Sequence, residues 1–104
     1  MRSKNGVCIT GIRPEILFGL MAAQNVYGNL GYDLIVTSVV DGKHSPTSLH
    51  YSGCAVDLRT RHMAVDDIKQ ARDQIAAALP NDFDVVLEPT HIHLEWQPRY
   101  KQEN

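Results

Sequence analysis

The chain has 104 residues, of which 43% are apolar and 21% are charged, and its formal net charge is −2. These values predict one globular domain over residues 1–104 with a modest core of its own. The small net charge gives no reason to expect nucleic acid or an anionic membrane as a partner. No apolar run approaches the roughly 18 residues of a membrane span, and no stretch has the form of a secretion signal. Two cysteines, Cys8 and Cys54, are too few for a disulfide framework.

Periodicity and turn residues divide most of the chain into two helices and four strands. Pro14 suits the first turn of a helix, apolar residues then recur at helical spacing, and Gly28 and Gly31 offer stops. A second amphipathic helix begins at or near Asp66 and stops at Pro80. β-Branched or alternating apolar residues predict strands at 33–40, 55–58, 83–88 and 91–96.

The remaining segments are expected to connect these elements. Residues 1–5 are polar and expected to be loose, and residues 7–10 form either a short edge strand or an extended segment. Asp41-Gly42 is a turn signal that opens a polar loop, and Pro89-Thr90 makes a tight connection between the last two strands.

The element order is therefore helix, strand, turn, strand, helix, strand, turn, strand. Close-paired strands with helices between them predict an α+β fold, in which a small antiparallel sheet carries two main helices packed on one face. The opposite face of the sheet would then be open to solvent and could carry polar side chains on rigid backbone.

Residues 48–57, Ser-Leu-His-Tyr-Ser-Gly-Cys-Ala-Val-Asp, contain two groups that suit a metal centre. His50 and Asp57 offer an imidazole and a carboxylate, which are the ligands of zinc sites that keep a fourth position open for water. A straight strand would separate them by about 23 Å and a helix by about 10 Å. The chain must therefore reverse between them, and Ser52-Gly53 is the natural place. On the strand that follows, Ala55 and Asp57 share a face, whereas Cys54 points away and is not expected to bind metal.

The segment His-Ile-His-Leu-Glu-Trp at 91–96 alternates strictly between polar and apolar residues. On a strand, His91, His93 and Glu95 point one way, and the apolar residues between them enter the core. We therefore expect His93 to complete the zinc site of His50 and Asp57, while His91 reaches past it toward a substrate. Glu95 either orients one of the histidines or is a plain surface charge.

The 48–57 stretch and His91-Ile92-His93 together resemble the zinc D-alanyl-D-alanine peptidase family. More widely they resemble the LAS group of peptidoglycan peptidases, whose fold is shared by the Hedgehog signalling domain. The resemblance covers roughly residues 32–96, and the compact length is similar to that of phage or prophage lysis enzymes of this group. Such an enzyme would be made in the cytoplasm without a visible signal peptide and would reach the bacterial cell wall by another route.

Carried over by residue, the resemblance implies that one zinc ion is bound by His50, Asp57 and His93. It assigns His91 to transition-state stabilisation or substrate binding, and His44 matches a loop histidine that the Hedgehog domain also has. Many relatives place an acidic base three residues before the last zinc histidine, where this chain has Thr90. An arginine common upstream of the Ser-x-His motif in carboxypeptidase members is also not evident.

These residues predict a zinc metallopeptidase that cuts peptide bonds of peptidoglycan. Zinc lowers the pKa of a bound water to about 7 and polarises a carbonyl. Glu88 is the residue assigned as general base for that water, and His91 and His44 are assigned to the oxyanion. The alternative is a non-catalytic binding module in which the same zinc site only supports the fold. The sequence leaves open which bond would be cut, an L-alanyl-D-glutamate bond or a D-alanyl linkage.

Overall fold

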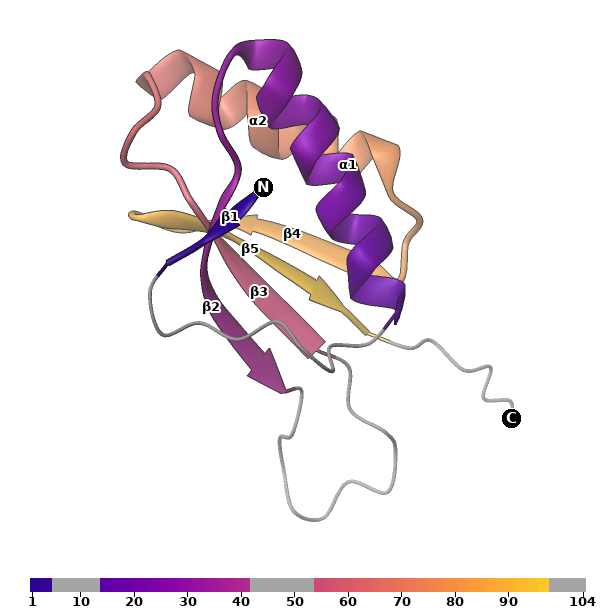
Figure 1. The fold of residues 1–104 in the computed structure, drawn as a ribbon. Helices are drawn as coiled ribbons and strands as arrows, with labels where there is room; N and C mark the ends of the chain where they lie inside the picture. The colour runs from indigo at the N-terminus through magenta and orange to yellow at the C-terminus, as the bar shows by residue number, and fades with distance from the viewer. Residues whose placement is uncertain (5–13, 42–53, 98–104) are drawn as a thin grey trace, which may run out of the picture.

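The computed structural model describes residues 1–4, 14–41 and 54–97 (Figure 1). In chain order its elements are β1 (Arg2–Ser3), α1 (Pro14–Leu30), β2 (Ile35–Asp41), β3 (Cys54–Arg59), α2 (Val65–Ala78), β4 (Phe83–Leu87) and β5 (His91–Trp96). The segment 7–10, both His44 and His50, and the expected reversal at Ser52-Gly53 lie outside the described residues.

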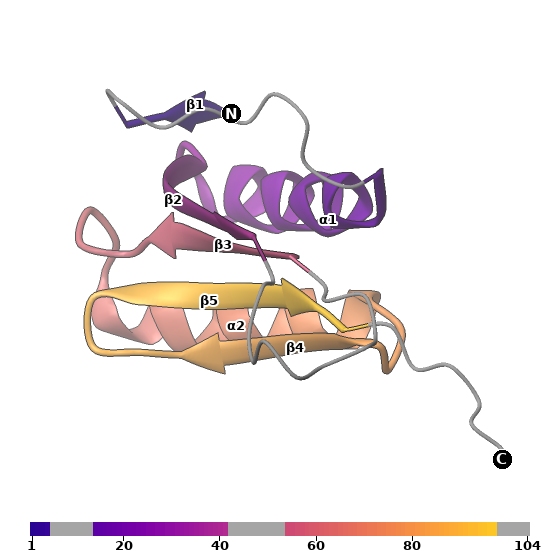
Figure 2. The ribbon, with the colours of Figure 1, turned by 90° about the horizontal axis from the view of Figure 1, so that it is seen from below.

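The strands form one five-stranded sheet in the order β1-β2-β3-β5-β4. The four longer strands pair antiparallel, and β1 pairs in parallel with β2, so the sheet is mixed. Both helices lie on the same side of this sheet, as the two perpendicular views show (Figures 1 and 2). The predicted α+β class is therefore confirmed, with the parallel strand β1 as an addition.

Strand β1 corrects the expectation that residues 1–5 are loose. The backbone N–H of Arg2 donates to the carbonyl oxygen of Leu34 at 2.8 Å, and that of Lys4 donates to Val36 at 2.8 Å. Both β1 residues are exposed, so this pairing buries no apolar side chain. The Arg2 guanidinium also forms an exposed ion pair with Asp33 at 2.6 Å. A strand held by backbone hydrogen bonds and a surface ion pair leaves no hydrophobic pattern in the sequence.

Helix α1 begins and ends where the sequence predicts. Pro14 is its first residue, and Gly31 follows its last residue with a positive φ of 91° that glycine adopts without strain. Tyr27 is fully buried on the inner face of the helix, and its hydroxyl donates a hydrogen bond to the carbonyl oxygen of Arg59 at 2.8 Å. Burial raises the pKa of the Tyr27 phenol. This bond ties α1 to the end of β3.

The core lies between the helices and the sheet. Strand residues alternate in burial along β5, where Ile92, Leu94 and Trp96 are buried and face the helices. Val56 and Leu58 do the same on β3. The prediction that Trp96 belongs to the core is confirmed, and its indole N–H donates to Asp82 at 3.0 Å. The polar residues between these positions necessarily lie on the face that the helices leave uncovered.

Neither α1 nor α2, the helices of the described residues, has both the length and the apolar character needed to cross a membrane.

Candidate metal centre

The pairing of β3 with β5 fixes the candidate site. Asp57 lies directly opposite His93 in the antiparallel register, Ala55 lies opposite Glu95, and Arg59 lies opposite His91. Side chains opposite each other in such a pair have Cβ atoms about 4.5–5.5 Å apart. The register therefore brings Asp57 and His93 together on the open face, as the alternation of both segments predicted.

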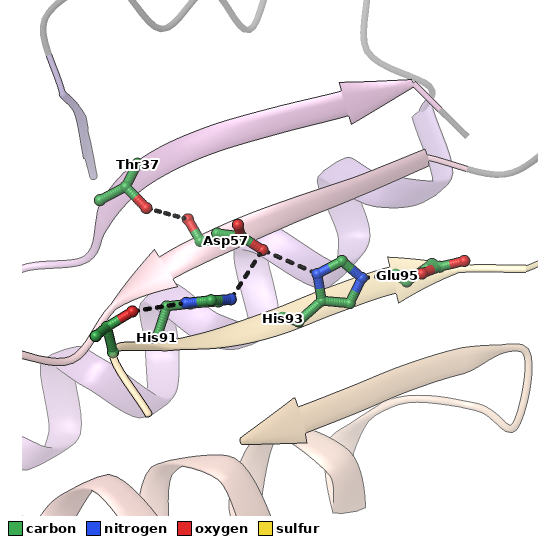
Figure 3. Close-up of polar contacts among 6 residues, drawn as sticks. Thr37, Asp57, His91, His93 and Glu95 are labelled. Carbon is green, nitrogen blue, oxygen red and sulfur yellow. Dashed lines mark hydrogen bonds and ion pairs between the residues drawn. The ribbon is translucent and has the colours of Figure 1, made fainter. Parts of the chain in front are cut away.

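His93 is held between two carboxylates (Figure 3). Its Nδ1 lies 2.9 Å from Oδ1 of Asp57, and its Nε2 lies 2.9 Å from Oε1 of Glu95. The second carboxylate oxygen of Glu95 accepts a hydrogen bond from the side-chain amide of Gln97. Of the two roles left open for Glu95, the structure shows the one in which it orients a histidine.

The carboxylates change the proton affinity of His93. Partial burial alone lowers the pKa of this imidazole, because it disfavours the charged form. The hydrogen bonds to Glu95 and Asp57 and the attraction of both negative charges together outweigh burial, so the pKa of His93 is raised above its usual value. A metal ion at this imidazole must therefore compete with a stabilised proton.

His91 completes the cluster from the beginning of β5. Its Nδ1 lies 3.1 Å from the hydroxyl oxygen of Thr90, and its Nε2 points toward Asp57, with 3.6 Å between Nε2 and Oδ1 (Figure 3). Thr90 holds one ring nitrogen and leaves the other facing the carboxylate. His91, which was expected to reach toward a substrate, thus lies close enough to bind the same ion as His93.

Asp57, His91 and His93 have the chemistry and spacing of a metal-binding group. One ligand atom from each of the three side chains lies within 4.8 Å of the others. Four ligands around a zinc ion at about 2.0–2.2 Å are separated by about 3.4 Å, so small side-chain rotations would bring the three into coordination distance. The side chains are 21–28% exposed, which leaves the cluster open to a ligand from solvent. These donors could hold a divalent transition metal.

A β-bulge lies beside the cluster on β2. The pairing of β2 with β3 shifts register between Val36 and Ser38, and the intervening Thr37 donates its hydroxyl to the carbonyl oxygen of Asp57 at 3.4 Å. Bulges often re-aim side chains beside functional sites. The sequence carries no turn residue that could have signalled this one.

Glu88 lies just after β4, in the connection to β5. Its backbone N–H donates to the carbonyl oxygen of His91 at 2.8 Å, and its side chain is half-buried. Val86 lies opposite His93 in the register, and Glu88 follows two residues later, beyond the end of β4 at Leu87. Among the described residues, the Glu88 carboxylate is not part of the cluster that could hold an ion.

Of the predicted site residues, the structure therefore brings together Asp57, His93 and His91, and places Glu88 in the connection between β4 and β5. His50 and His44 lie outside the described residues. Comparisons with protein-family models, with curated proteins and with solved structures return no match for this chain.

Proposed function

We propose that this chain is a zinc-dependent peptidase that hydrolyses peptide bonds of bacterial peptidoglycan. The observation that supports it most directly is the open cluster of Asp57, His91 and His93, which gathers a carboxylate and two imidazoles on one face of a rigid sheet. A site of this composition is typical of catalytic zinc, which keeps one position for water or substrate. The motif at 48–57 supports the same assignment.

His50 is the proposed third ligand beside Asp57 and His93. Asp57 is three residues into β3 from Cys54, a distance of about 10 Å along the strand. Three residues lie between Cys54 and His50, and the four Cα-to-Cα steps that join them can span up to about 14 Å. The chain is therefore long enough to bring His50 back alongside Asp57 if it reverses near Ser52-Gly53.

The chain's own residues supply the remaining chemistry. A bound zinc ion would polarise the scissile carbonyl and make a water acidic enough to attack near neutral pH. Glu88 accepts the proton of that water and passes it to the leaving amine. His91, held by Thr90 with its Nε2 directed at the cluster, donates a hydrogen bond to the developing oxyanion. His44 is the proposed second donor to the oxyanion.

A non-catalytic binding module is the second candidate. It would need only the cluster of Asp57, His91 and His93, which bridges β3 and β5, and no general base. In such a module zinc would hold β3 and β5 together and the open face would dock a partner, without hydrolysis.

Digestion of purified peptidoglycan separates these two functions. Wild-type protein is expected to release peptide fragments, detected by mass analysis, and a chelator should abolish this release. Glu88→Gln should retain zinc and lose at least about 100-fold in rate, the lower end of the range for general acid–base catalysis. Asp73→Asn, an exposed substitution on α2, is the matched control and should keep full activity. A wild-type protein that holds zinc and releases no fragments would establish the binding module instead.

A further inference from the structure

A cavity of about 450 Å³ adjoins the candidate metal centre. We name it the cationic pocket, and it is lined by Lys4, Thr37, Arg59, Arg61, Thr90 and His91. Three of these residues carry a positive charge and two offer hydroxyl groups, and no acidic residue of the described ranges lines the cavity. Such a lining is unexpected in a chain of net charge −2, and it concentrates positive potential at one end of the open sheet face.

The sheet itself assembles the cationic pocket. The backbone N–H of Lys4 is hydrogen-bonded to Val36, which brings this lysine beside β2. Arg59 is the last residue of β3 and lies opposite His91 on β5. Arg61, two residues further, is exposed. Segments from opposite ends of the chain therefore contribute charge to a single cavity.

Arg59 has a donor that is not satisfied within the described residues. Its Nε is buried and has no hydrogen-bond partner among them. A buried N–H without a partner is unfavourable, and it is a strong donor toward any acceptor that enters the cavity. The planar fork of an arginine matches two oxygens of a carboxylate or of a phosphate, and the carboxylate is the one that a peptide carries.

We propose that the cationic pocket is a subsite for a carboxylate of the peptide held at the metal centre. The inference rests on the proposed function, because His91 both lines the pocket and belongs to the metal-binding group. Arg59 and Asp57 are two residues apart on one strand face, about 6.5 Å along β3. A peptide bond at the metal centre would thus place a carboxylate one or two residues away in the pocket. The substrate class implied is an acidic peptide.

The test is a titration of the full chain, kept free of metal, with three small probes. Glutarate supplies carboxylates, glutaramide is its neutral counterpart of equal length, and inorganic phosphate is a second anion. Glutarate is expected to shift the NMR signal of the Arg59 Nε–H in the metal-free protein, and glutaramide is not. Added salt should weaken the binding, because the pocket is open to solvent.

Variants assign the binding to the cationic pocket. Arg59→Gln and Arg61→Gln should each weaken glutarate binding about fivefold, the size expected of one partly exposed charge pair. Arg59→Lys should retain more of the affinity for glutarate than Arg59→Gln does. Arg72→Gln on α2 removes the same charge far from the pocket and should leave binding unchanged. Arg61 is exposed, so Arg61→Gln provides the test even if a change at Arg59 disturbs folding.

Three results would overturn the inference: equal binding of glutarate and glutaramide, binding of phosphate without glutarate, or glutarate binding that both glutamine variants leave unchanged. Because the titration uses metal-free protein, its result is independent of zinc binding and hydrolysis. Glutarate binding in a chain that never hydrolyses a peptide would uphold the anion site and refute only the peptidase. If the wild type is a peptidase, and the Arg59 and Arg61 variants change the hydrolysis of acidic and of amidated peptides equally, only the subsite would be refuted.

Discussion

Nδ1 of His93 lies 2.9 Å from Oδ1 of Asp57, although 36 positions separate the two residues in the sequence. They meet because they are directly opposite in the pairing of β3 with β5. The same register buries Leu58 opposite Ile92 on the helix-facing side. A slip of one residue would turn every side chain of a strand to the other face. The packing of the core therefore fixes the geometry of the polar site.

Asp57→Asn is expected to reduce zinc affinity by at least about 100-fold, since even changes to the partners of metal ligands cost about 10–100-fold. The asparagine keeps the shape of the side chain and removes the charge that zinc requires. Competition with a chromophoric chelator measures the affinity. Asp73→Asn is the matched control and should bind zinc as the wild type does. Equal affinities for the two variants would remove Asp57 from the site.

His50→Ala and His91→Ala distinguish the two ligand sets that are compatible with the structure. If His50 is the third ligand, His50→Ala should lose zinc, whereas His91→Ala should retain it and lose activity. The reverse pattern would mean that the cluster of Asp57, His91 and His93 binds the ion by itself. Zinc content after dialysis and peptidoglycan hydrolysis are measured on the same samples.

The open face of the sheet was predictable because a strand places alternate residues on opposite sides. The sequence 91–96 alternates strictly, so His91, His93 and Glu95 could be assigned to one face before the structure was known. The contact between His93 and Asp57 also requires that β3 pair with β5 in this register, which alternation does not give. Alternation could not separate the roles of the two histidines, and Nε2 of His91 lies 3.6 Å from Oδ1 of Asp57.

Other features could not be predicted, because they depend on backbone pairing between distant segments. Strand β1 has two exposed residues and no apolar pattern, so nothing in residues 1–5 indicated that Lys4 would approach Arg59. The bulge at Thr37 breaks the register of β2 without a glycine or proline to mark it. The cationic pocket includes Lys4 and Thr37, so sequence periodicity alone could not predict it.

Glu95→Gln tests whether Glu95 orients His93. The carboxylate lies 2.9 Å from Nε2 of His93, on the opposite side of the ring from Asp57. Loss of its charge should weaken zinc binding about 10-fold or more, because carboxylate partners fix the ring and raise the basicity of a ligating imidazole. Zinc affinity is measured by chelator competition, with Asp73→Asn again as the control. If the zinc affinity is unchanged, Glu95 is only a surface charge with no effect on the metal site.

The metal-free protein should gain stability from protonated His93. The pKa of His93 is raised in the folded chain, so protonation favours the folded state. This contribution is fully present below the unfolded pKa of about 6.5 and is lost as the pH rises through the folded pKa. Urea unfolding with a chelator present measures the effect. The free energy of unfolding of the wild type should exceed that of His93→Gln by more at about pH 5.5 than at about pH 8.5. A difference that grows with pH would contradict the assigned contacts.

Two glycines of α1 provide a test of how closely this helix packs on the sheet. A Cβ atom at Gly19 would lie 2.9 Å from Cδ2 of Leu94 and 3.1 Å from Cε2 of Phe83, whereas nothing lies within 4 Å of one at Gly28. Gly28→Ala should raise the free energy of unfolding by about 0.5–1 kcal/mol, because alanine favours the helix. Gly19→Ala gains the same helix preference but overpacks a buried contact at a cost of about 1–3 kcal/mol.

Gly19→Ala should therefore be less stable than Gly28→Ala by about 1–3 kcal/mol, which urea denaturation of both variants measures directly. Leu94 and Phe83 lie on β5 and β4, so the loss at Gly19 reports the seating of α1 on the strands that carry the histidines. Zinc binding is the second measurement on these variants. Since Leu94 lies between His93 and Glu95 in the chain, strain at Leu94 should also weaken zinc affinity in Gly19→Ala, and Gly28→Ala should bind normally. Equal stability of the two variants would mean that α1 does not contact the sheet at this position.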